Sequence, residues 1–145
     1  MREIAGHLRV EGRSYGRARA AAAALVLLAG PACGGGSASD AASSLASLAA
    51  GASFVGELRL RDAVSAVYAK DLLDDMRGEA RKAAEPLRKS REPGVASVID
   101  DAERLDSAFA AMRRALDAGD APKLRQAAAE ADELAQSLSE AGGGG

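Results

Sequence analysis

Residues 95–116 read VASVIDDAERLDSAFAAMRRAL. Apolar side chains recur here at alternating spacings of three and four residues: Val95, Val98, Ala102, Leu105, Phe109, Met112 and Leu116. An α-helix turns once every 3.6 residues, so this spacing places them on one face. Ile99 and Ala108 widen that face. The stretch therefore predicts an amphipathic helix with one side buried in a core.

Turn-forming residues bound this helix on both sides. Glu92-Pro93-Gly94 precedes it, and Gly119 predicts a left-handed stop at its C-terminus. Asp120 is a cap for the next helix, with Pro122 in the first turn, where proline is tolerated. The same spacing then returns in Leu124, Ala127, Ala131, Leu134 and Leu138. Because the connection is short, we expect the two helices to be antiparallel neighbours.

Residues 53–90 predict one long helix upstream of that pair, with Ser53 as its cap. At 1.5 Å per residue it would be about 55 Å long. Pro86 removes a backbone donor, which predicts a kink or an end near Ala84. Two apolar stripes run along the segment: Leu60, Val64 and Val67, then Leu73, Met76, Ala80, Ala83 and Leu87.

The composition favours an all-α protein. Alanine is the most frequent residue, there is no Trp, and there are only two Tyr and two Phe. We expect residues 53–141 to form a small antiparallel three-helix bundle with an overlong first helix. Residues 33–52 are expected to be a Gly/Ser/Ala tether with a marginal helix around Leu45 and Leu48, and residues 142–145 a disordered tail. Dimerisation through the first helix and a monomer folded back at Pro86 stay equally open.

The first 32 residues have a different character. They contain five arginines and then an uninterrupted apolar run, AAAAALVLLA, at residues 20–29. This run is too short to cross a membrane, which needs about 20 residues. It fits the apolar region of a secretory signal, which has about 7–15 residues. Gly30-Pro31-Ala32 and then Cys33 follow, and a Gly/Ser-rich stretch begins at Gly34.

This arrangement resembles the signal of bacterial lipoproteins. In that class a peptidase cuts just before the cysteine, whose thiol carries diacylglycerol. The resemblance implies that residues 1–32 are a signal peptide and that Cys33 is the lipidation site. Gly34 after the cysteine resembles the pattern for the outer membrane, facing the periplasm, if the organism is diderm. Pro31 departs from the usual motif, and an ordinary secretory signal cut at the same bond would leave Cys33 as a free or bridging thiol.

The residue types exclude several chemistries. His7 is the only histidine and lies in the segment expected to be removed, so the remainder has no imidazole for haem, di-iron or Ser–His chemistry. Several acidic residues share one helix face, but Arg77, Arg81 and Lys82 lie within a turn of them, which favours a solvated surface with ion pairs over a metal site. These acidic residues are Asp71, Asp74, Asp75 and Glu79. We therefore expect no catalytic residue, no metal ligand and no cofactor.

The charge pattern also bears on partners. The arginines of the first 32 residues leave the remainder net acidic, which argues against nucleic acid. The densest basic run is Arg81, Lys82, Arg88, Lys89 and Arg91. Solvated surface near a helix C-terminus is the favoured interpretation, and contact with anionic membrane headgroups near the tether is the second.

These observations favour a membrane-tethered, non-enzymatic envelope protein that acts through a protein partner or as a homodimer. The expected contact surface on the first helix consists of Leu60, Val64, Val67, Tyr68 and Leu72. Tyr68 and Leu72 are not needed by the second apolar stripe. The alternative is a bundle that binds a small ligand or a metal ion in a cavity lined by alanines, Met76 and Met112. Core packing is the simpler role for both methionines.

Overall fold

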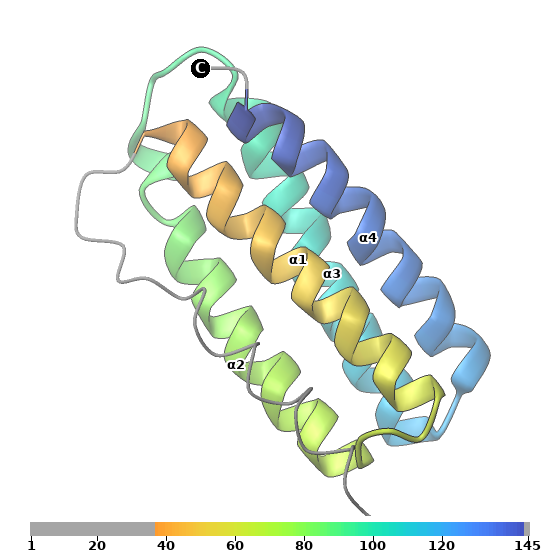
Figure 1. The fold of residues 1–145 in the computed structure, drawn as a ribbon. Coiled ribbons are helices and arrows are strands. Elements are labelled where there is room, and N and C mark those ends of the chain that lie inside the picture. The colour runs from red at the N-terminus through yellow and green to blue at the C-terminus, as the bar shows by residue number, and fades with distance from the viewer. Residues whose placement is uncertain (1–36, 144–145) are drawn as a thin grey trace, which may run out of the picture. The chain divides into compact units, whose positions relative to one another are not determined.

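The computed structural model describes residues 37–143, and Cys33, the predicted signal and residues 144–145 lie outside this range. Four α-helices and one 3₁₀ helix follow one another: α1 (Ala38–Leu60), α2 (Ala66–Ala84), η1 (Leu87–Lys89), α3 (Val95–Ala118) and α4 (Ala121–Gly143). Consecutive α-helices run in opposite directions in an up-down-up-down bundle (Figure 1). The expected all-α antiparallel bundle is confirmed, with four helices in place of three.

α1 is a core helix where a tether was expected. The Ser37 hydroxyl accepts the backbone N–H of Asp40, and the Asp40 carboxylate accepts the N–H of Ser37, which caps the helix. One leucine and three alanines of α1 are at most 1% exposed: Ala42, Leu45, Ala49 and Ala52. The prediction of a tether is therefore wrong for residues 38–52. The buried face of residues 38–52 is mostly alanine, so Leu45 and Leu48 alone do not reveal it in the sequence.

The long helix expected for residues 53–90 is interrupted at residues 61–65. Asp62 has a positive φ of 54°, and the Ala63 N–H donates to the Leu58 carbonyl at 2.9 Å, which closes the end of α1. Ser65 then caps α2 by accepting the N–H of Tyr68 at 3.1 Å. The prediction of an overlong first helix is therefore wrong, because α1 has 23 residues and α3 has 24.

Most predicted helix ends are confirmed. α2 ends at Ala84, shortly before Pro86, and α3 ends at Ala118, followed by Gly119, whose φ is 64°. Asp120 accepts the N–H of Lys123 at 3.0 Å, as expected of a cap. The disordered tail is wrong for residues 142 and 143, since α4 continues to Gly143 and the Ser39 hydroxyl donates to the Gly142 carbonyl.

Each helix packs on two neighbours around a shared core. α1 and α3 both lie between α2 and α4, and the packing of α1 on α4 is the most extensive. Small residues allow this approach, since Gly56 lies directly against Ala128 and Met112. The largest fully buried side chains are Phe109, Leu45, Leu73, Leu105, Met112, Leu134 and Leu138.

The bundle has two distinct ends (Figure 1). At the end that we call proximal, α1 begins, α4 ends, and η1 connects α2 to α3. At the distal end, residues 61–65 connect α1 to α2, and the Gly119 turn connects α3 to α4.

Candidate functional site

Three large apolar side chains are exposed among the described residues. Phe54 is 43% exposed, Val67 65% and Tyr68 58%. Phe54 lies in the second half of α1, and Val67 and Tyr68 lie in the first turn of α2, so all three belong to the distal half of the bundle. We call Phe54, Val67 and Tyr68 the distal apolar residues.

The start of α2 explains why Val67 and Tyr68 face solvent. Ser65 fixes the first turn through its bond to the N–H of Tyr68. Ala69 and Leu73, at most 1% exposed, then direct one face of α2 into the core. Val67 and Tyr68 fall outside that face because side chains at i and i+4 share a side of a helix.

The predicted contact surface is only partly exposed. Val67 and Tyr68 are exposed, whereas Leu60, Val64 and Leu72 are half-buried and pack against the core. Leu60, Val64 and Leu72 therefore contribute mainly to packing near the distal end and little to its exposed surface. Phe54 was not among the predicted contact residues. The sequence predicted a helix capped by Ser53, and Phe54 belonged to neither of its apolar stripes.

Two ion pairs lie between Phe54 and Val67 in the sequence, at the end of α1 and in the turn that follows it. Arg59 pairs with Asp62, and Arg61 pairs with Glu57 at 3.4 Å. Exposed apolar side chains together with charged ones are the usual composition of a protein–protein contact. The distal half of the bundle thus has the residue types of a contact surface.

A second group of charges joins α2 to α3. Asp106 accepts hydrogen bonds from Arg77, with both donor–acceptor distances 2.7 Å, and from Arg81, at 2.7 and 3.1 Å. These bonds, first from Arg77 and then from Arg81, hold the pKa of Asp106 well below its usual range. These hydrogen bonds join α2 to α3, and the charge of Asp106 is paired with those of Arg77 and Arg81. The contact is therefore a structural feature.

Further ion pairs extend this interface toward the distal end. Lys70 donates to Asp117 at 2.9 Å, which lowers the pKa of the Asp117 carboxyl. Arg113 donates to both Asp74 and Asp117, at 3.1 and 3.2 Å. Asp74, one of the four acidic residues weighed as metal ligands, is thus an ion-pair partner. Within residues 37–143, no cluster of three or more His, Cys, Asp or Glu side chains has the spacing of a metal site.

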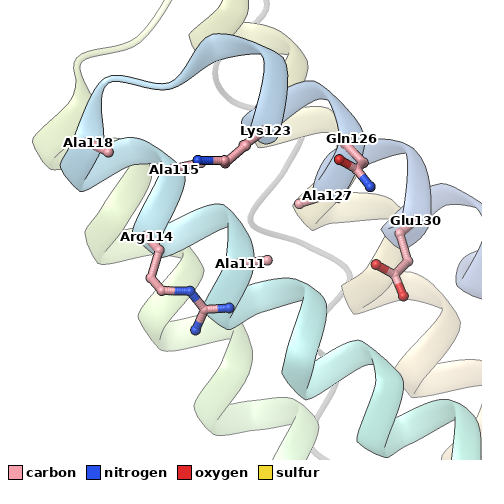
Figure 2. Close-up of a pocket in the computed structure, with 8 residues that line it drawn as sticks. All are labelled: Ala111, Arg114, Ala115, Ala118, Lys123, Gln126, Ala127 and Glu130. Carbon is pink, nitrogen blue, oxygen red and sulfur yellow. The ribbon is translucent and has the colours of Figure 1, made fainter.

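Two shallow grooves run between helices. The first lies between α3 and α4 and is lined by alanines and charged or polar side chains (Figure 2): Ala111, Arg114, Ala115, Ala118, Lys123, Gln126, Ala127 and Glu130. The second lies between α1 and α4 and includes Ala50 and Asp132. Neither groove includes Met76 or Met112, which pack against Gly51 and Gly56 of α1. The methionines therefore fill the core beside α1.

By length and composition, α1 qualifies as a membrane-spanning helix, and 39% of its most apolar window is buried in the bundle. The burial of α1 in the bundle accounts for this composition, because a helix that packs in a protein core is also apolar. Comparison with protein-family models, curated proteins and solved structures finds no match for the chain. The functional argument therefore rests on the residues and their geometry.

Proposed function

We propose that the chain is a lipid-anchored protein of the bacterial cell envelope whose helical bundle acts, without catalysis, through a protein partner at its distal end. The observation that carries this proposal is the separation of two features. α1 begins at Ala38, five residues after the candidate lipidation site Cys33, whereas the distal apolar residues lie in the opposite half of the bundle. A tether at one end leaves the opposite end free for a partner.

The anchor is tested by the intact mass of the protein extracted from its native membrane, with Cys33→Ser in parallel. We expect a diacylglycerol mass on Cys33 in the native protein, and loss of membrane association in the variant. A water-soluble native protein with an unmodified thiol would refute the anchor.

The contact surface is tested by a photoreactive residue placed at Tyr68 in living cells. We expect a discrete protein adduct at this position, lost in a Val67→Glu background. Ala96→Glu is the matched control, because Ala96 is exposed near the start of α3, where an acid suits the helix dipole. Equal adducts in the Val67→Glu and Ala96→Glu backgrounds would refute the distal contact. The adduct mass also distinguishes a second copy of this chain from a different protein.

A further inference from the structure

The segment that joins α2 to α3, residues 85–94, lies beside the start of α1. The Glu92 carboxylate accepts the backbone N–H of Ala38 at 3.2 Å, and the Ser90 hydroxyl accepts the N–H of Glu92 at 3.2 Å. Leu87, only 2% exposed, fixes η1 to the core, while Arg88 and Lys89 remain exposed. We call residues 85–94 the proximal loop, and these contacts hold it next to the residue at which α1 begins.

The acidic groups of the proximal loop and of the start of α1 are engaged, whereas Asp100, early in α3, is exposed and forms no ion pair within residues 37–143. Asp40 and Glu92 both accept N–H groups at the N-terminus of α1, the positive end of the helix dipole. Glu85 pairs with Lys89 at 3.6 Å. Glu140, in the last turn of α4 and therefore also at the proximal end, lines the groove between α1 and α4.

The basic groups of the same loop have fewer ion-pair partners. Arg88 and Arg91 are exposed, and neither forms an ion pair within residues 37–143. Two other cations of the basic run noted in the sequence have partners, since Arg81 binds Asp106 and Lys82 binds Glu79. The proximal loop therefore directs two uncompensated guanidinium groups to solvent, beside the Lys89 ammonium.

The short segment between Cys33 and α1 limits how far the basic side chains of the proximal loop can lie from the anchor. Ala38 is five residues after Cys33, and a fully extended chain spans at most about 3.6 Å per residue, so the two are at most about 18 Å apart. α3, with 24 residues, is about 36 Å long at 1.5 Å per residue. If Cys33 is held at a bilayer surface, the proximal loop stays near that surface and the distal end can stand clear of it.

We propose that the proximal loop contacts anionic phospholipid headgroups through Arg88, Lys89 and Arg91. This inference rests on the anchor of the proposed function. Each basic side chain near an anionic bilayer favours contact by roughly fivefold, and the anchor raises the local concentration of headgroups. The contact orients the bundle with its proximal end on the membrane.

The experiment supplies the anchor chemically, so that it does not depend on natural lipidation. Residues 33–145, which include the whole described bundle, are coupled through the thiol of Cys33, the only cysteine, to a maleimide lipid in vesicles. One set of vesicles contains only phosphatidylcholine, and the other also contains phosphatidylglycerol. Trypsin cleavage after Lys89 is followed by mass spectrometry, with cleavage after Arg59 and Arg61 at the distal end as an internal reference.

We expect cleavage after Lys89, relative to the distal reference, to be at least about fivefold slower on phosphatidylglycerol vesicles. The difference should vanish at about 1 M salt, where the Debye length is about 3 Å. It should also vanish in Arg88→Gln/Arg91→Gln, and persist in the control variant Lys123→Gln, which removes a cation at the distal end.

Equal relative cleavage on both vesicle types, or protection that survives in Arg88→Gln/Arg91→Gln, would overturn the proposal. A native Cys33 without diacylglycerol would instead refute the proposed function. Since the vesicle result is obtained with a synthetic anchor, the two failures are distinguishable.

Discussion

At the residue scale, two glycines inside helices have opposite environments. A Cβ on Gly56 would lie 2.8 Å from the Cβ of Ala128 and 2.9 Å from Cε of Met112, whereas a Cβ on Gly78 would meet nothing within 4 Å. We expect Gly56→Ala to destabilise the bundle by about 1–3 kcal/mol through overpacking. Gly78→Ala should stabilise it by about 1 kcal/mol through helix propensity. Urea unfolding checks both, and shifts of the same sign would contradict the packing of α1 on α4.

Asp106 is the carboxylate on which the interface of α2 and α3 depends most. Asp106→Asn removes the charge that two guanidinium groups share, so we expect a loss of about 1–2 kcal/mol in the free energy of unfolding at neutral pH. Asp117→Asn is the matched control at the same interface, because Asp117 is more exposed than Asp106 and its loss should cost less stability. An equal cost for both variants would show that the Asp106 contact is no stronger than a surface ion pair.

The lowered pKa of Asp106 also predicts a pH dependence. A carboxyl whose folded-state pKa lies below its unfolded value stabilises the protein above the unfolded pKa, here the ordinary value near 3.8. That contribution is lost as the pH falls below about 4. In thermal melts between pH 7 and pH 2, Asp106→Asn should therefore lose less stability than the parent chain. Parallel pH profiles for the two proteins would refute this assignment.

At the scale of the element, α1 is the helix whose role the sequence predicted least well. Leu45 is 1% exposed, so Leu45→Ala should destabilise the bundle by about 2–5 kcal/mol. Ser47 is exposed on the same helix, and Ser47→Ala should change stability by no more than about 0.5 kcal/mol. If residues 38–52 were a tether, both variants would leave the unfolding midpoint unchanged.

The reason that α1 was missed lies in its side chains. Periodic leucines and a phenylalanine revealed α3, and the flanking Gly94 and Gly119 gave its limits. In α1 the buried positions are mostly alanine, which also occurs at its exposed positions, such as Ala50. Alanine therefore carries little contrast between faces, and only the close approach of α4 decides which alanines are buried.

The candidate site, like α1, could be predicted only in part from the sequence. Val67 and Tyr68 were recognised because they are apolar residues that the stripe through Leu73 does not use. The break between α1 and α2 has a local signal, since Ser65 is a good cap and the stripe of Leu60, Val64 and Val67 is out of phase with the stripe that starts at Leu73. The left-handed conformation of Asp62 has no such signal, because glycine or asparagine is the usual residue there.

At the scale of the whole molecule, the two long sides of the bundle are held together differently. Small residues join α1 to α4, whereas ion pairs of Lys70, Arg77, Arg81 and Arg113 reinforce the contact of α2 with α3. Close packing depends weakly on salt, and surface ion pairs are screened by it. Loss of the ion pairs therefore weakens the side that carries the proximal loop and the start of α2.

The geometry of the ends predicts how the anchored molecule stands on a membrane. A tether at the proximal end and headgroup contacts of the proximal loop both favour an upright bundle, with Tyr68 far from the bilayer. Neutron reflectometry of the Cys33-coupled chain on a bilayer containing phosphatidylglycerol should show a protein layer about 35–40 Å thick, the length of α3 plus its turns. A bundle lying flat would give about 20 Å, two helix layers 8–10 Å apart. Arg88→Gln/Arg91→Gln should thin the layer, because the tether alone permits tilting. A flat layer for the parent chain would bring the distal apolar residues near the bilayer, and the protein-partner role of the distal end would then be untenable.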